Sequence, residues 1–570
     1  MSENIIRVQD LSFKYPGGQE YVLKNVNLDI SKGDFIGLLG SNGSGKTTLC
    51  KSFNGLIPHY YVGDYEGSVT VEDQEVFDSS VTSLAQIVGY VYQDFENQLV
   101  RPTVYDEVTF APLNFGYEDY NERGQKALEI LGLEAIADKF IWELSGGQKH
   151  LVALAGVLAL DPEVIVIDEP VAQLDPVNAK KIYDKLEMLN KQEGKTIISI
   201  EHHTKFIANY CSRVIMMDQG QVAWQKEVKP ALSQVEELKQ KKIFPPQVTQ
   251  AVHNLDSKQQ RYPVTIEEAE SYFKQNYNFD YAESFTPVTE DNQNKQEAVI
   301  EFNNVTHSYQ TLSKQSQTAL DSVNLSFNEG DRVALVGSNG AGKSTLLKMI
   351  TGISKPKQGA VIVEGEKTQH TSSEELAEEV TYIYQNPEEM FINDNIRADI
   401  EYYLKVRNAP NYEEFIAEII STFALEELQD RDGRLLSGGQ QRRASLAIGM
   451  AMRPSVILLD EPTSSLDIAS RKEMFTMIEK LEKWVKTVIV ATHDMQLVAN
   501  WADRVVVLNQ GQVIKDTDRE GLFNNKQLLD RANLQPPQIV ELSRRLNMNP
   551  ITLSVKEFGQ RLRGEQDEAI

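Results

Sequence analysis

Cysteine is scarce in this chain, since its 570 residues include two, Cys50 and Cys211, in unrelated contexts. So few thiols exclude a disulfide framework and a zinc or iron–sulfur cluster, and they fit a reducing cytosol. Long apolar runs are missing as well, because none approaches the ~18–20 residues of a membrane-spanning helix. The N-terminal sequence MSENIIRVQDLSF lacks a basic segment followed by an apolar one. We therefore expect any membrane role to be peripheral.

Positive charge is also in deficit. Lys and Arg number 57 against 83 Asp and Glu, which gives a net charge of -26. A protein that binds nucleic acid through a broad basic surface needs the opposite balance. The hydrophobic fraction of 41% and the charged fraction of 25% are typical of a globular protein. We expect no nucleic-acid partner and a chain of several packed domains.

What the chain does contain is one long pattern that occurs twice. Residues 144–170 read LSGGQKHLVALAGVLALDPEVIVIDEP, which predicts a turn, an apolar helix and a buried strand that ends in Asp168 and Glu169. The same order recurs at residues 435–462 and ends in Asp460 and Glu461. Adjacent acids at the end of a buried strand need a cation or a shared proton. The pattern predicts a metal site in each of two duplicated units.

A glycine-rich loop follows a short apolar strand in each unit and matches G-x-x-x-x-G-K-[ST]. Its backbone N–H groups can surround phosphates, Lys46 or Lys343 can reach the terminal phosphates, and Thr47 or Ser344 can bind Mg²⁺. The predicted nucleotide-binding residues here are Gly40, Ser41, Asn42, Gly43, Ser44, Gly45, Lys46, Thr47 and Thr48, and Gly337, Ser338, Asn339, Gly340, Ala341, Gly342, Lys343, Ser344 and Thr345.

Hydrolysis of a bound nucleotide also needs a base or a group that positions water beside the γ-phosphate. Glu169 and Glu461 stand one residue beyond each predicted metal-site aspartate and suit that role. A single His at a strand end is more often structural than catalytic. His202 and His493 occupy matched strand ends, so we expect them to contact the γ-phosphate or the water.

A glutamine follows another apolar strand in each unit. Gln93 and Gln385 are open to two interpretations, one as ordinary loop residues and one as side chains that reach Mg²⁺ or the attacking water. The predicted Mg²⁺ ligands are Thr47, Gln93 and Asp168 in the first unit, and Ser344, Gln385 and Asp460 in the second.

The order of these motifs in both halves resembles the ATPase subunits of ABC transporters. The resemblance implies an α/β fold of two tandem P-loop (RecA-like) ATPase domains, each with an antiparallel β subdomain, a helical subdomain and a small C-terminal helical tail. It also implies ATP and Mg²⁺ as cofactors, Tyr15 and Tyr309 as adenine-stacking rings, and a signature turn that closes on the nucleotide of the other unit. The signature residues are Ser145, Gly146, Gly147 and Gln148, and Ser437, Gly438, Gly439 and Gln440.

Domain boundaries follow from the repeat. We expect a first ATPase domain at 1–225, a helical tail and polar linker at 226–297, a second ATPase domain at 298–525 and a C-terminal helical tail at 526–570. The run Thr286–Lys295 is the predicted linker. A Pro-Pro-Gln element occurs in both tails, at residues 245–247 and 536–538.

Short loop motifs narrow the resemblance. Gln98-Leu99, residues 103–110, residues 114–116 and residues 54–60 are similar to the energy-coupling factor group of micronutrient (vitamin or metal ion) importers, although Met390 replaces Gln98 in the second unit. This implies two membrane partners, a transmembrane coupling protein and a separate substrate-binding subunit, and a location at the cytoplasmic face of the cell membrane.

Three other functions stay open. A soluble twin-ATPase acting on the ribosome would favour a basic linker, whereas residues 283–297 are acidic. The fused ATPase of a sugar importer would favour one degraded site, whereas both sites here keep Lys, Asp, Glu and His. A nucleotide-gated scaffold would show no steady-state ATP turnover.

The two units also differ. Leu151 aligns with Arg443, and residues 171–173 (Val-Ala-Gln) align with 463–465 (Thr-Ser-Ser). In the head-to-tail arrangement that the resemblance implies, both changes face the Lys343 site. The sequence therefore predicts slower turnover at the Lys343 site than at the Lys46 site.

Overall fold

The computed structural model describes residues 3–171, 174–259, 261–277, 298–310, 316–407, 410–464 and 466–568. The chain divides into two compact units, Met1–Tyr277 with Gly559–Ile570, and Asn278–Phe558. The predicted linker, Thr286–Lys295, lies outside the described residues, and so do Ala172, Gln173 and Ser465 of the unit comparison. The boundaries near residues 225 and 525 stay predictions.

A six-stranded sheet forms the centre of the first unit, in the order β10-β9-β3-β8-β7-β6. Strands β9, β3, β8, β7 and β6 run parallel, and β10 is antiparallel to β9. Parallel strands covered on both faces are typically continuous apolar runs, and β7, Val-Ile-Val-Ile-Asp, is buried throughout. Because their carboxyl ends share one edge, the loops after them converge there. The bounds are β3 Phe35–Leu39, β6 Val88–Val91, β7 Val164–Asp168, β8 Thr196–Ile200, β9 Arg213–Asp218 and β10 Gln221–Glu227.

A four-stranded antiparallel sheet, in the order β2-β1-β4-β5, packs with the helix that follows the phosphate loop. Alternate residues of β1 face the core, as half-buried strands require. Leu49 and Phe53 of that helix join the same core. The bounds are β1 Asn4–Lys14, β2 Leu23–Ser31, β4 Asp64–Val71, β5 Gln74–Glu75 and α1 Lys46–Phe53.

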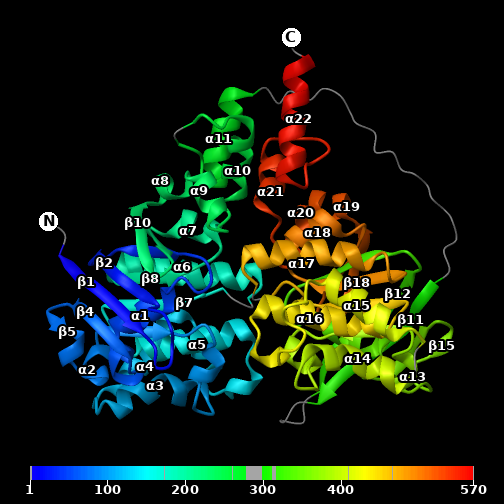
Figure 1. Ribbon diagram of the computed structural model, residues 1–570, viewed down its shortest axis with the longest axis horizontal. Helices are drawn as coiled ribbons and strands as arrows, with labels where there is room; N and C mark the ends of the chain where they lie inside the picture. Colours follow the sequence, from blue (N-terminus) through cyan, green and yellow to red (C-terminus); the bar gives the residue numbers. More distant parts are fainter. Residues whose placement is uncertain are drawn as a thin grey trace. The chain divides into compact units, whose positions relative to one another are not determined.

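A helical subdomain and a helical tail complete the part of the first unit before residue 278, whose elements run from blue to green in Figure 1. The helices α3, α4 and α5 pack on one another, and α5 begins at the signature turn. Pro246 of the Pro-Pro-Gln element stands at the N-cap of α10 in the tail. The bounds are α2 Val81–Ala85, α3 Val104–Asn114, α4 Tyr120–Leu131, α5 Gly146–Leu158, α6 Pro176–Glu193, α7 Thr204–Tyr210, α8 Val228–Leu232, α9 Val235–Gln240, α10 Gln247–Leu255 and α11 Ile266–Asn276.

The second unit repeats this plan, with sheets in the orders β16-β17-β18-β13-β19-β20 and β12-β11-β14-β15. Its strands are β11 Ala298–Gln310, β12 Ser316–Asn328, β13 Arg332–Val336, β14 Gln358–Val363, β15 Glu366–Lys367, β16 Val380–Ile383, β17 Val456–Asp460, β18 Thr487–Thr492, β19 Arg504–Asn509 and β20 Gln512–Asp518. Its helices are α12 Lys343–Ile350, α13 Ser373–Leu376, α14 Ile396–Val406, α15 Tyr412–Thr422, α16 Gly438–Ala451, α17 Ile468–Leu481, α18 Met495–Trp501, α19 Arg519–Asn524, α20 Lys526–Arg531 and α21 Gln538–Arg545. The last helix, α22 Val555–Glu568, begins in the second unit and belongs to the first from Gly559 onward.

The predicted fold class is confirmed: each unit has a mainly parallel core, an antiparallel sheet and helices. Pro537 stands at the N-cap of α21, so the Pro-Pro-Gln element starts a tail helix in both halves of the sequence. Among the described residues, every helix is too short or too polar to cross a bilayer.

Candidate active sites

Each glycine-rich loop wraps back on its own lysine. Lys46 Nζ donates to the carbonyl oxygens of Gly40 and Ser41 at 2.9 and 3.1 Å, and Lys343 Nζ makes the matching bonds at 2.8 and 3.3 Å. Gly45 has a φ of 97°, and a Cβ on Gly40 would lie 2.4 Å from Ser44 Oγ. Glycine is therefore required at these two positions, and the amides and the lysine of the loop form a cradle for phosphate oxygens.

Two of the three predicted metal ligands of the first unit, Thr47 in the first turn of α1 and Asp168 at the end of β7, are in contact, whereas Gln93 bonds Glu169. Thr47 Oγ1 donates to Asp168 Oδ2 at 2.9 Å, and Tyr90 from β6 donates to the same oxygen at 3.2 Å. Burial raises the pKa of Asp168, and the bonds from Thr47 and Tyr90 partly oppose that rise. A cation beside this carboxylate would favour its ionised form.

The second unit builds the same corner. Tyr382 donates to Asp460 Oδ2 at 2.6 Å, Ser344 also bonds Asp460, and the buried Oδ1 has no partner. Hydroxyl and carboxylate oxygens fit Mg²⁺, which is commonly held by one or two carboxylates together with substrate phosphates. The described part of the chain has no cluster of three His, Cys, Asp or Glu side chains for a metal, so phosphates would complete the shell.

Glu169 brings three predicted residues together. Gln93 Nε2 donates to Glu169 Oε2 at 2.8 Å, and His202 Nε2 lies 3.0 Å from Oε1. These side chains come from the ends of β6, β7 and β8, which are neighbours in the sheet. Glu169 has a φ of 51°, a strained conformation that is often found at functional sites.

Glu461 is held differently. His493 Nδ1 lies 2.8 Å from its Oε2, and Lys343 Nζ lies 3.5 Å from its Oε1. Burial alone would raise the pKa of Glu461, but the charge and hydrogen bonds of His493 and the charge of Lys343 lower it. Within the described residues, Gln93 bonds Glu169 and no such bond from Gln385 reaches Glu461.

The two signature turns are helix N-termini. Ser145 Oγ accepts from the Gln148 N–H at 3.4 Å, and Gln148 Oε1 accepts from the Ser145 N–H at 3.0 Å, a capping box that recurs at Ser437 and Gln440. A Cβ on Gly146 or on Gly438 would meet nothing within 4 Å. The turns can therefore receive an anion, and their pairing with the nucleotide of the other unit stays a prediction.

The two predicted adenine-stacking rings stand beside the helices that start at the phosphate loops. The hydroxyls of Tyr15 and Tyr309 lie 3.3 Å from Thr48 Oγ1 and Thr345 Oγ1, respectively. Tyr15 also packs edge-on against Tyr61, with ring centroids 6.1 Å apart, whereas Tyr309 is 44% exposed.

Sequence reasoning missed two matched pairs. Tyr90 and Tyr382 contact the metal-site aspartates, and their place three residues before each glutamine was a visible signal. The second pair is His150 and Arg442 on the signature helices. Arg442 donates to Tyr384 O at 3.2 Å and to Ser464 Oγ at 3.1 Å.

His150 takes the position of Arg442 without its contacts. It stacks on Phe95 with centroids 4.6 Å apart, neither ring nitrogen has a hydrogen-bond partner, and burial lowers its pKa to about 4. Arg443 donates to Ala424 O instead. The side chain of Arg443 thus points toward the backbone at Ala424. The difference between His150 and Arg442 is the one that reaches the glutamine segment, because Arg442 bonds the carbonyl of Tyr384, the residue before Gln385.

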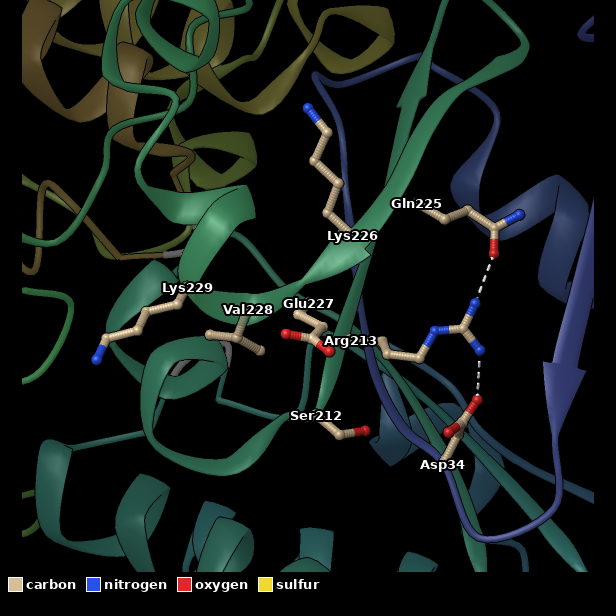
Figure 2. A pocket seen from close by; sticks show the side chains of 8 residues that line it. All are labelled: Asp34, Ser212, Arg213, Gln225, Lys226, Glu227, Val228 and Lys229. Atoms are coloured by element: carbon tan, nitrogen blue, oxygen red, sulfur yellow. Dashed lines mark hydrogen bonds and ion pairs between the residues drawn. The ribbon is translucent and has the colours of Figure 1, made fainter. Parts of the chain in front are cut away.

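A pocket of about 560 Å³ lies elsewhere in the first unit (Figure 2). Asp34, which lines it, precedes β3, whereas the phosphate loop follows β3, so the pocket is at the opposite edge of the sheet. Arg213 is paired with Asp34 at 2.7 Å, and Lys229 is paired with Glu268. This pocket contains none of the predicted site residues.

Comparisons with known proteins agree with this geometry. A family model described as ABC transporter matches residues 23–172 and 320–464. A protein from Caldanaerobacter subterraneus subsp. tengcongensis, named as an ABC transporter ATP-binding protein, is 33% identical over 98% of this chain and 99% of its own. A similarly named protein from Methanosarcina mazei is 31% identical over 100% and 98% of the two chains.

Two solved structures are also similar. CbiO1 of Clostridium perfringens, described as part of the ABC transporter complex CbiONQ, is 32% identical over 44% of this chain and 99% of its own, with a TM-score of 0.39. The archaeal ribosome recycling factor aABCE1, in its complex with stalk protein aP1, is 20% identical over 90% of both chains, with a TM-score of 0.56. At 20% identity, the similarity to aABCE1 shows a shared fold alone.

Proposed function

Since the chain belongs to the ABC transporter ATPase family, we propose that it is the energy-coupling subunit of a membrane importer of the energy-coupling factor type. It would work at the cytoplasmic face of the cell membrane and hydrolyse ATP to drive uptake of a micronutrient, a vitamin or a metal ion. A transmembrane coupling protein and a separate substrate-binding membrane subunit would be its partners.

The two sites supply the residues that hydrolysis requires. Lys46 and Lys343 bind the terminal phosphates, and Glu169 and Glu461 orient and deprotonate the attacking water. His202 and His493 contact the γ-phosphate or that water. Such a base typically contributes ~10²–10⁴ in rate.

Thr47, Asp168 and Gln93, or Ser344, Asp460 and Gln385, would hold Mg²⁺, and the ion would neutralise charge on the phosphate groups. The chain's own part is to fix the side-chain oxygens that would hold the ion. Tyr90 and Tyr382 hold Asp168 and Asp460 in place, and the bond from Gln93 to Glu169 links the predicted ligand to the predicted base.

The observation that carries the membrane-coupling proposal is a loop built alike in both units. The buried Glu107 of α3 accepts the N–H groups of Val100 and Arg101 at 2.9 and 2.6 Å. In the second unit Asp399 of α14 accepts those of Ile392 and Asn393 at 3.0 and 2.8 Å.

Each loop presents an aliphatic side chain to solvent, Val100 with 62% and Ile392 with 71% of its surface exposed. The loops follow Gln93 and Gln385 in the chain, so a partner seated on them is close to the residues that sense the nucleotide. The buried carboxylates fix the shape of these two loops, as a docking surface for a partner requires.

Copurification tests the proposal. The tagged chain is expressed in its own host, membranes are solubilised in mild detergent, and the bound proteins are identified by mass spectrometry. We expect two different multi-spanning membrane proteins, and their loss from a Val100→Asp, Ile392→Asp variant. A chain recovered with ribosomes, or membrane proteins retained by the variant, would contradict it.

A further inference from the structure

Glu201 is a buried carboxyl group that none of the predicted sites uses. It stands between β8 and His202 and is 1% exposed. Its Oε1 accepts the backbone N–H groups of His202 and His203, both at 2.8 Å, and its Oε2 accepts the hydroxyl of Tyr183 at 2.8 Å. A buried carboxyl is stable only when bonded in this way. The Glu201 carboxyl group therefore fixes the backbone N–H groups of His202 and His203, and with them the backbone that orients the His202 ring.

The second unit lacks this arrangement. Thr492 occupies the position of Glu201, and Phe475 that of Tyr183. Thr492 Oγ1 accepts the N–H of Asp494 at 2.9 Å and lies 3.4 Å from Glu461 Oε2. A hydroxyl does not titrate near neutral pH, so His493 is held by groups of fixed charge state at this position.

We infer that Glu201 is a positioning residue whose carboxylate holds His202 against Glu169, and whose protonation controls hydrolysis at the Lys46 site and not at the Lys343 site. The inference rests on the proposed role of His202 in hydrolysis. Its geometric basis is the pair of N–H bonds to Oε1 together with the 3.0 Å contact between His202 and Glu169.

The carboxyl group titrates in the physiological range. Burial raises the pKa of Glu201 to about 7, the charge of Glu169 adds to the rise, and the N–H of His203, the Tyr183 hydroxyl and His202 oppose it. The titratable groups that face Glu201 are Tyr183 on α6, Cys211 after α7, Glu169 after β7 and His202. Burial raises the pKa of Tyr183 and of Cys211, so both stay neutral near pH 7.

The ionised and protonated forms hold the loop unequally. A carboxylate is the stronger acceptor, because charge-assisted hydrogen bonds are roughly twice as strong as neutral ones. Protonation weakens the bonds to the His202 and His203 N–H groups and frees the ring to leave Glu169. The other end of the loop has a fixed anchor, since Thr204 Oγ1 donates to Phe244 O at 2.8 Å.

ATP turnover between pH 6 and pH 8.5 tests the inference in a Glu461→Gln background, which leaves the Lys46 site active. Glu201→Gln keeps an oxygen for the two N–H groups but cannot ionise. The ATPase activity of the Glu461→Gln protein divided by that of the Glu461→Gln, Glu201→Gln protein should fall by up to about ten-fold from pH 8 to pH 6, with a midpoint near 7. Thr204→Val, which removes the other anchor, should lower activity equally at every pH.

Two further arms keep the test decisive. In a Glu169→Gln background, where the Lys343 site works alone, Glu201→Gln should leave the pH profile unchanged. Tyr183→Phe, the residue of the second unit, removes a bond that lowers the pKa of Glu201, so it should move the midpoint to higher pH.

A ratio that is constant from pH 6 to pH 8, or a midpoint that Tyr183→Phe leaves in place, would overturn the inference. An equal effect of Glu201→Gln in both backgrounds would overturn its restriction to one site. His202→Ala in the Glu461→Gln background separates the premise, because full activity there would refute the role of His202 itself. Circular dichroism and binding of a fluorescent ATP analogue verify that each variant is folded.

Discussion

The ammonium group of Lys343 lies 3.5 Å from the carboxylate of Glu461, and both side chains are more than nine-tenths buried. In the first unit the corresponding carboxylate, Glu169, is held by Gln93 and His202. The predicted base of the second unit thus forms an ion pair with the lysine that is predicted to bind the γ-phosphate, so we expect nucleotide binding to break that ion pair.

Glu461→Gln should therefore tighten ATP binding at the Lys343 site by about five- to ten-fold, since breaking a buried pair costs on the order of 1 kcal/mol or more. Glu169→Gln should change ATP affinity at the Lys46 site by less than about two-fold, a difference within the scatter of exposed contacts. Titration with a fluorescent ATP analogue, with the other site removed by Lys46→Ala or Lys343→Ala, measures both. Equal tightening at the two sites would contradict the role of the ion pair.

Turnover should also differ between the sites. In the head-to-tail arrangement implied by the family, the Lys343 nucleotide faces the signature helix of the first unit, where His150 replaces Arg442. We expect Glu169→Gln to lower steady-state ATPase activity more than Glu461→Gln does, because Glu169→Gln removes the faster site. Equal losses, or a larger loss with Glu461→Gln, would refute this asymmetry.

His150→Phe should stabilise the first unit. It keeps the stack on Phe95 and removes two buried ring nitrogens that have no partner. Burial lowers the pKa of His150 to about 4, so the unfolded chain binds a proton there that the folded chain does not, and stability falls as pH drops below about 6.5. The gain in melting temperature should be larger at pH 5 than at pH 8. Arg442→Phe is the matched variant in the second unit.

Arg442→Phe should lower the melting temperature and the ATPase activity, since it breaks the bonds to Tyr384 O and Ser464 Oγ. Differential scanning calorimetry measures both substitutions. A gain from Arg442→Phe, or a gain from His150→Phe that is the same at both pH values, would show that the two positions do not differ as described.

Much of each site could be predicted because the repeat marks it. The phosphate loops, the Asp-Glu pairs and the strand-end histidines occur twice in one order, and parallel strands bring their carboxyl ends to one edge. Gln98 shows where motif reasoning is incomplete. In the sequence it indicates a sub-family, and in the structure its side chain closes the loop by accepting the Tyr92 N–H and donating to Tyr90 O, both at 3.2 Å.

Contacts across the fold could not be read from the sequence. The bond from Tyr183 to Glu201 depends on how α6 packs on β8, and a tyrosine in a helix looks like any core aromatic. Arg442 likewise resembles an exposed signature-helix arginine until the helix is seen to bury it with 6% of its surface exposed. Spacing identifies residues that act at strand ends and leaves their supporting partners to tertiary packing.

The central claim is that two glutamate-centred sites hydrolyse ATP, and steady-state ATP turnover of the Glu169→Gln, Glu461→Gln double variant tests it most directly. Turnover should fall ~10²–10⁴-fold relative to the parent, with ATP binding retained. A double variant that keeps the parental rate would show that neither carboxylate serves as the base and would contradict the account.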